Sequence, residues 1–180
     1  MNEGFSTKDM AKMAMCLAVI SVSSYITFPL PFTPVWVVAT TAATCLTAFV
    51  LTPRQTFLTL VAYIILGGVA GLPILPGGMG GLGRILGPTG GFYFGWIVAF
   101  TLVSFFKGNK IDFKRYSIVG IVISLPVVYA GGLISMILVL DISLQAALVQ
   151  AVLPFIFGDV VKCILAAFLG VRINKALANG

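Results

Sequence analysis

Six long apolar stretches, separated by segments rich in proline, glycine or charge, dominate the pattern of hydrophobic and polar positions along the chain. A helix that crosses a bilayer needs about 20 mostly apolar residues, and each stretch comes close to that length. The pattern therefore predicts an all-α integral membrane protein with a single six-helix transmembrane domain over residues 1–180. The predicted spans are Met10 to Phe28, Val35 to Leu51, Phe57 to Leu72, Gly91 to Phe106, Ser117 to Leu140 and Phe155 to Val171.

The composition supports a membrane protein. Apolar residues make up 59% of the 180 positions and charged residues only 9%, whereas a soluble domain carries about 25% charged residues. The chain is too short to hold six spans and a soluble catalytic domain as well. Its function must therefore lie within the bilayer or at its two faces.

The basic residues are distributed unequally between the two predicted sides. Six spans place both termini and the second and fourth connecting segments on one side, with nine of the eleven lysines and arginines. Arg84 lies on the other side, and Lys162 lies inside the sixth span. Because cytoplasmic segments carry an excess of Lys and Arg, we predict that both termini are cytoplasmic. The nine residues are Lys8, Lys12, Arg54, Lys107, Lys110, Lys114, Arg115, Arg172 and Lys175.

Several classes of function lack the residues they need. The chain has no histidine, and its three cysteines lie far apart, so we expect no metal site, no other cofactor and no catalytic residues. An intramembrane enzyme would need paired catalytic groups, and the spans hold one carboxylate. The scattered basic residues give no stripe for nucleic acid, so we expect no such partner.

A glycine-rich run contains the spacing of a nucleotide-binding motif, from Gly78 to Gly83. No predicted strand precedes it, and Arg84 and Ile85 stand where a phosphate-binding loop would have Lys and Ser or Thr. We therefore expect no nucleotide site, so any pumping must draw on a partner or an ion gradient.

The segment from Gly71 to Gly91, between the third and fourth spans, is unusually long and rich in proline and glycine. One interpretation is a flexible connector. The other is a structured outer loop that lays irregular backbone against a buried ligand, where side chains would be too bulky. Its length and apolar content favour the ligand-lining loop.

Asp159 and Lys162 stand inside the sixth stretch, three residues apart and therefore on one face of a helix. Each alone would cost about 2.5 to 3.5 kcal/mol near the bilayer centre, so both must face protein or a polar cavity. They could form a purely structural ion pair. In the functional interpretation, Asp159 accepts hydrogen bonds from a ligand and Lys162 donates to a ligand oxygen.

Two further patterns concern helix ends and helix contacts. The segment after Asp141 predicts a short surface helix that begins at Ser143, with Pro154 in the first turn of the last span. The small residues Ala14 and Ala18, with Ala11 one turn earlier, permit close approach of another helix. This helix could belong to the same chain or to a partner subunit.

Taken together, the chain resembles the biotin-specific substrate-binding subunits, or S components, of energy-coupling factor (ECF) vitamin transporters. The resemblance covers about Met10 to Lys175. It depends on the order and spacing of Gly71-Leu72-Pro73, Gly77-Gly78-x-Gly80-Gly81, Leu86-Gly87-Pro88-Thr89-Gly90-Gly91-Phe92 and Gly158-Asp159-x-x-Lys162.

This resemblance implies a multi-pass protein of a bacterial or archaeal cell membrane that takes up biotin with high affinity. It implies three partner subunits, a transmembrane scaffold and two cytoplasmic ATPases, with the scaffold contacting Ala11, Ala14 and Ala18. It also implies that the loops at Pro29 to Pro34 and Gly71 to Gly91 close over the vitamin. The expected substrate-binding residues are Asp159, Lys162, Tyr93, Gly90, Gly91, Thr89, Phe92, Arg84 and Trp36.

The chemistry of biotin suits these residues. Its ureido group carries two N–H donors and a carbonyl, matching Asp159 and Lys162, and aromatic side chains can wall its rings. Arg84 either meets the carboxylate or lies at the membrane surface.

The chain also departs from the family pattern. Trp36 and Val38 occupy positions where the family often has Thr and Gln, and Phe92 replaces a usual tyrosine, with Tyr93 next to it. Two alternatives therefore stay open: an S component for another vitamin-like molecule, and a solitary biotin transporter.

Overall fold

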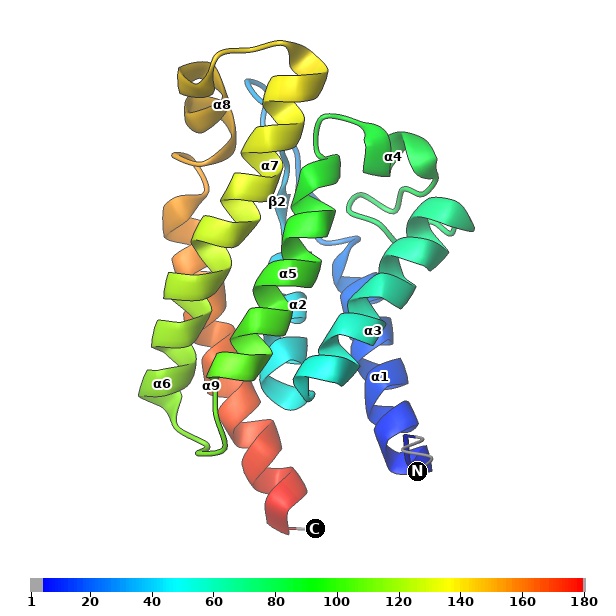
Figure 1. Cartoon of the computed structure of the whole chain (residues 1–180), viewed down its shortest axis with the longest axis vertical. Helices are drawn as coiled ribbons and strands as arrows, with labels where there is room; N and C mark the ends of the chain where they lie inside the picture. The colour runs from blue at the N-terminus through cyan, green and yellow to red at the C-terminus, as the bar shows by residue number, and fades with distance from the viewer. Residues whose placement is uncertain (1–4, 180) are drawn as a thin grey trace.

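Helices match all six predicted spans and run side by side along the long axis of the molecule, in a computed structural model that describes residues 5–179 (Figure 1). The first three are α1 (Thr7–Ser23), α2 (Thr40–Val50) and α3 (Pro53–Ile64), which continues into a π-helical turn, η1 (Ile65–Val69). The fourth is α5 (Gly90–Phe106). The fifth is built from α6 (Phe113–Val119), a second π-helical turn η2 (Gly120–Ser124) and α7 (Leu125–Leu140), and the sixth is α9 (Ile156–Asn179).

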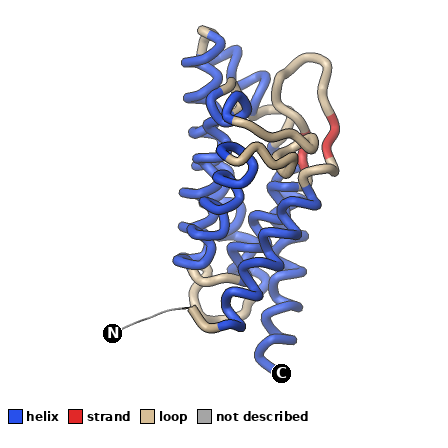
Figure 2. The backbone as a smooth tube through the Cα atoms, turned by 90° about the vertical axis from the view of Figure 1, so that its right-hand side faces the viewer, coloured by secondary structure: helices blue, strands red, loops and turns tan. Residues whose placement is uncertain are grey.

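Shorter elements gather at one end of this bundle (Figure 1). The helix α4 (Leu82–Leu86) lies within the Gly71 to Gly91 segment, and α8 (Leu144–Ala151) connects α7 to α9. Two strands that the sequence did not predict, β1 (Thr27–Phe28) and β2 (Val37–Val38), pair antiparallel in the loop between α1 and α2 (Figure 2). The fold is therefore mostly helical, with a small ribbon beside the outer loops.

Only some of the six predicted spans correspond to helices that are long and apolar enough to cross a membrane. Among the described residues, the continuous helix Phe113–Leu140 is long and apolar enough to cross a bilayer, and α8 with α9 forms a second candidate bent by 50°. The helices α2 and α5 are apolar but shorter. The count of six crossings thus stays a prediction.

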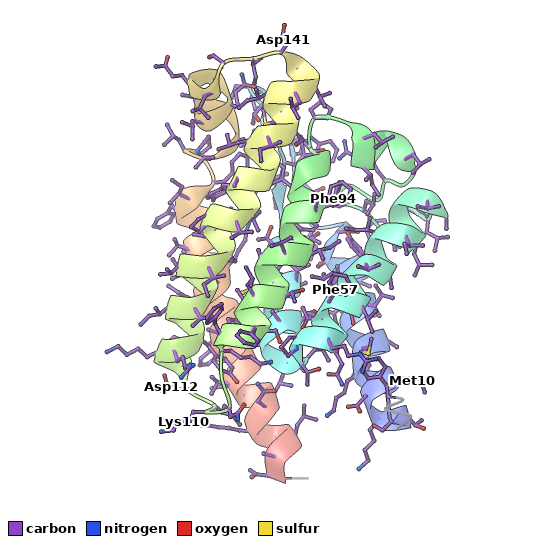
Figure 3. All side chains as sticks on the ribbon, viewed as in Figure 1. Met10, Phe57, Phe94, Lys110, Asp112 and Asp141 are labelled. Carbon is purple, nitrogen blue, oxygen red and sulfur yellow. The ribbon has the colours of Figure 1, made fainter. Side chains whose placement is uncertain are left out.

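The two ends of the bundle carry different groups of residues. Met10, Lys110 and Asp112 lie at the end where α9 finishes, whereas Asp141 lies at the opposite end (Figure 3). The N-terminal end of α1 also lies at the first of these ends (Figure 1). An even number of passes along the bundle produces this arrangement, as the prediction of six requires.

Large apolar side chains cover much of the outer surface. Met15, Leu138 and Phe157 are between 70% and 82% exposed, and Phe57 and Phe94, labelled in Figure 3, are about half exposed. Thr40, Thr44 and other threonines are instead buried between the helices. Apolar residues outside and hydroxyl groups inside suit a bilayer, because threonine can hydrogen-bond to the backbone of its own helix. Thr44 does this, donating to the carbonyl of Thr40 at 3.0 Å.

Glycines allow α5 and α7 to approach closely. A Cβ atom on Gly91 would lie 2.0 Å from the carbonyl oxygen of Gly131, and one on Gly95 would lie 3.1 Å from the Cα of Val128. The contact holds the end of α5 that carries Phe92 and Tyr93 directly against α7.

Two predicted helix starts can be compared with the structure. Ser143 is the N-cap of α8, where its hydroxyl accepts from the backbone N–H of Ala146 at 3.3 Å, which confirms the predicted surface helix. Pro154 lies in a turn before Ile156 and not in the first turn of α9, so that prediction was wrong. The break lets α8 fold over the end of the bundle at an angle to α9.

Candidate functional site

A cavity lies between the outer loops and the upper ends of α5, α7 and α9, at the end of the bundle that holds α4 and α8. It encloses about 580 Å³ of unoccupied space, including the part that opens to solvent. Residues from at least six separate segments line it. Seven of the nine predicted substrate-binding residues are among them: Trp36, Arg84, Thr89, Phe92, Tyr93, Asp159 and Lys162.

The charged pair stands on the first turns of α9. Lys162 Nζ lies 2.8 Å from Asp159 Oδ1, and the two side chains are 17% and 10% exposed. The other carboxylate oxygen, Oδ2, accepts a hydrogen bond from the hydroxyl of Tyr129 on α7, at 2.7 Å. The predicted ion pair therefore exists, and because it lines a cavity it remains available to a ligand.

Aromatic side chains form the apolar wall of the cavity. Tyr93 and Trp96 lie one turn apart on α5 and pack edge to face, with ring centroids 5.3 Å apart. Both are almost fully buried. Phe92 comes from the same helix, and Trp36 comes from the loop before β2. These rings are suited to a flat, uncharged ligand body.

Arg84 on α4 lies at the mouth of the cavity. Its guanidinium carbon is 5.5 Å from the centroid of the Trp36 ring, and its buried Nε has no hydrogen-bond partner among residues 5–179. The side chain is half-buried and lines the cavity, so it does not lie free at the surface. Lys162 is paired with Asp159, whereas Arg84 has no ion-pair partner among residues 5–179, and its positive charge favours an anionic group on the ligand.

The two outer loops are fastened to one another. The backbone N–H of Gly77 donates to the carbonyl of Ser24 at 2.8 Å, and the hydroxyl of Tyr25 donates to the carbonyl of Pro73 at 2.6 Å. Gly77 has a φ of +83°, and a Cβ there would lie 2.3 Å from the ring of Trp36. The Gly71 to Gly91 segment therefore lines the cavity and is bonded to the neighbouring loop, which favours the interpretation as a ligand-lining loop.

The glycine run in this loop is bonded to the end of the third span. The N–H of Gly81 donates to the carbonyl of Gly67 in η1 at 2.8 Å, and the helix that follows, α4, has five residues. The absence of a nucleotide site stays an expectation from the sequence.

Gly90 and Gly91 are not among the residues that line the cavity. A Cβ on Gly90 would lie 1.8 Å from the carbonyl oxygen of Ile85, and Gly91 packs against Gly131. The structure thus gives both glycines a packing function at the start of α5. Their contact with a ligand stays a prediction.

Sequence reasoning missed several lining residues, including Tyr129, Trp96 and Phe155. Tyr129 is the only tyrosine or tryptophan in α7, and a hydroxyl inside an otherwise apolar span needs a partner. Asp159 is the one carboxylate within the predicted spans. The need of the Tyr129 hydroxyl for a partner could therefore have predicted the contact between these two residues.

The small residues of α1 lie away from the cavity. Ala11, Ala14 and Ala18 are all exposed on the outer surface of the bundle, together with Met15 and Val19. Packing within the chain is therefore excluded for these three alanines. A face of small and apolar residues is left open to lipid or to another subunit.

Known proteins are similar to this chain in sequence and in fold. The model of the BioY family matches residues 1–179. A protein of Bacillus subtilis named "Probable biotin transporter BioY" is 31% identical, with 94% of this chain and 92% of the relative covered. "Biotin transporter BioY2" of Lactococcus lactis is 34% identical, over 93% of this chain and 90% of the relative.

A solved structure extends the similarity to three dimensions. The S-component for biotin from an ECF-type ABC transporter superposes with a TM-score of 0.85 at 27% identity, covering 96% of this chain and 95% of the solved one. The residues matched by the family model, 1–179, include the glycine-rich outer loop, Asp159 and Lys162. The chain therefore belongs to the BioY family.

Proposed function

We propose that this chain binds biotin in the cavity and acts as the substrate-specific S component of an ECF-type transporter. The observation that carries this proposal is the arrangement of charge around an aromatic cavity. Asp159, held by Lys162 and Tyr129, stands at one side, and Arg84, which forms no ion pair within the described part of the chain, stands at the mouth. Its relatives are named as transporters, in keeping with the expectation that the chain is not an enzyme.

Biotin has the chemistry that these groups require. A ureido N–H group matches an acceptor oxygen of Asp159, and the neighbouring ureido carbonyl matches the ammonium of Lys162. The ring pair fits between the aromatic side chains, and the carboxylate at the end of its apolar chain reaches Arg84. In this pose one ureido N–H group, the ureido carbonyl and the carboxylate each have a partner, which lowers the cost of burying them in the cavity.

The distribution of the basic residues and the apolar outer surface support the orientation of the chain in the membrane. The exposed apolar side chains face lipid, with six crossings and both termini in the cytoplasm beside the nine basic residues. The cavity then faces the outside of the cell, where biotin is captured. The protein is placed in the cell membrane of a bacterium or archaeon.

Transport needs energy that this chain does not supply. Its partners in this proposal are a transmembrane scaffold and two cytoplasmic ATPases, with Ala11, Ala14 and Ala18 as the contact with the scaffold. The exposure of these three alanines on one helix supports a protein contact there.

Isothermal titration of the purified protein with biotin tests the binding step, and saturable binding is expected. Absence of saturable binding below micromolar concentrations would overturn the proposal. Mass spectrometry of ligand retained through purification identifies the bound molecule without assuming it. Uptake of biotin by this chain alone, in a host that lacks the ATPase subunits, would contradict the proposed partners and support a solitary transporter.

A further inference from the structure

Tyr129 contacts the Asp159 carboxylate, which lines the cavity, from a helix that contributes no charge. Its side chain is 8% exposed, and its hydroxyl lies 2.7 Å from Asp159 Oδ2. The ammonium of Lys162 lies 2.8 Å from Oδ1. Each carboxylate oxygen thus has one protein donor, and the two donors come from different helices.

The Asp159 carboxylate keeps free hydrogen-bond acceptor positions for a ligand. An ionised carboxylate has about four lone-pair positions, two on each oxygen. Lys162 and Tyr129 take one position on each oxygen, which leaves one free on each. Either free position can accept a hydrogen bond from an N–H group of a ligand.

The position of Tyr129 depends on the π-helical turn that precedes it. In η2, the hydroxyl of Ser124 bonds to the carbonyl of Gly120 and lies 3.6 Å from Cys163 Sγ, the residue after Lys162. Ser124 and Tyr129 therefore both face α9, at Cys163 and Asp159. A π-helical turn adds a residue and changes which face of the helix follows it, and such turns recur at functional sites.

From these contacts we propose that Tyr129 is a positioning residue that fixes the orientation of Asp159, so that a free acceptor position of the carboxylate faces a ureido N–H group. Tyr129 acts through the carboxylate and not through the ligand. This inference rests on the proposed binding of biotin.

A double-mutant cycle tests the binding consequence. Tyr129→Phe removes only the hydroxyl, and we expect at least fivefold weaker binding of biotin by isothermal titration. In an Asp159→Asn background the same substitution is expected to change the affinity by less than twofold, because the oriented carboxylate is already gone. Tyr116→Phe is the matched control, since this buried tyrosine bonds to Asn174 and does not line the cavity.

Two binding results would overturn the inference. One is Tyr129→Phe binding biotin as tightly as the unaltered chain. The other is an equal loss in both backgrounds, which would mean that the hydroxyl touches the ligand directly. Failure of the unaltered chain to bind biotin would instead refute the proposed function.

Infrared spectroscopy tests the contact between Tyr129 and Asp159 in the absence of a ligand. The chain has four aspartates, so labelling aspartate with ¹³C marks four side-chain carboxylates, and subtraction of the Asp159→Asn spectrum isolates one. We expect Tyr129→Phe to shift the antisymmetric stretch of Asp159 and Tyr116→Phe to leave it unchanged. An Asp159 band that does not move in Tyr129→Phe would overturn the inference whether or not biotin binds.

Discussion

The guanidinium of Arg84 lies over the indole of Trp36, with 5.5 Å from its central carbon to the ring centroid. The contact joins the two outer loops at the mouth of the cavity, because Arg84 stands on α4 and Trp36 stands before β2. A cation held on an aromatic face in this way is already in place for an incoming anion.

Replacing Arg84 with Gln is expected to weaken the binding of biotin at least tenfold, because the carboxylate loses its partner. Binding of biotin methyl ester, which has no negative charge, is expected to change less than twofold. Titration of both ligands measures the difference. Lys110→Gln removes the same charge at the opposite end and serves as the control. Equal losses for the two ligands would contradict a role in recognising the carboxylate.

Asp159→Asn is expected to weaken biotin binding more than tenfold. The amide offers an N–H group toward a ligand N–H group, and Lys162 is left without its counter-charge. Asp141→Asn is the matched control, since Asp141 is exposed beyond the end of α7 and does not line the cavity. Unchanged affinity in Asp159→Asn would make the ion pair purely structural.

Gly77→Ala is expected to lower both the melting temperature and the affinity for biotin. Alanine at a φ of +83° is strained, and its Cβ would meet the Trp36 ring at 2.3 Å; strained backbone of this kind costs about 1 to 3 kcal/mol. Thermal unfolding in detergent measures the loss. Gly83→Ala is the control, because a Cβ there meets nothing within 4 Å. The prediction fails if the two variants unfold at the same temperature.

Lys107→Met is expected to destabilise the fold without altering the cavity. Lys107 Nζ donates to the carbonyl oxygens of Ala48 and Phe49, each at 2.8 Å, and to that of Leu51, thereby capping the end of α2. Loss of donors to buried carbonyl groups costs about 1 to 3 kcal/mol. Lys110→Met, at an exposed site in the same loop, should leave the melting temperature unchanged. Equal melting temperatures for the two variants would show that the cap adds no stability.

Ala14→Leu is expected to reduce co-purification with the scaffold and ATPase subunits at least fivefold, since a larger side chain keeps a partner helix from close approach. Biotin binding should remain within twofold of the unaltered chain, because Ala14 lies away from the cavity. Ala130→Leu, an exposed alanine on α7, is the control. If both variants assemble normally, the contact lies elsewhere on the bundle.

The sequence predicted the features that depend on local spacing. Asp159 and Lys162 lie three residues apart on a helix, so their pairing followed from helical geometry alone. The cap at Ser143 likewise depends only on residues near it.

Features that depend on contacts between distant segments could not be predicted from the sequence. The contact of Tyr129 with Asp159 joins residues 30 positions apart and depends on a π-helical turn that no apolar pattern marks. The packing of Gly90 against Ile85 and of Gly91 against Gly131 could not be predicted, because a motif does not reveal which neighbouring backbone a glycine faces. Strands of two residues, such as β1 and β2, are too short to show an alternating pattern.

The bonds between the two outer loops also have a kinetic consequence. Ligand passing between these loops must first break the Tyr25 bond to Pro73 and the Gly77 bond to Ser24, and lift Arg84 from Trp36. The two hydrogen bonds involve the protein alone, so every ligand that leaves between the loops faces the same cost of breaking them. The loops therefore set an upper limit on the rate of escape, and two ligands of unequal affinity share it.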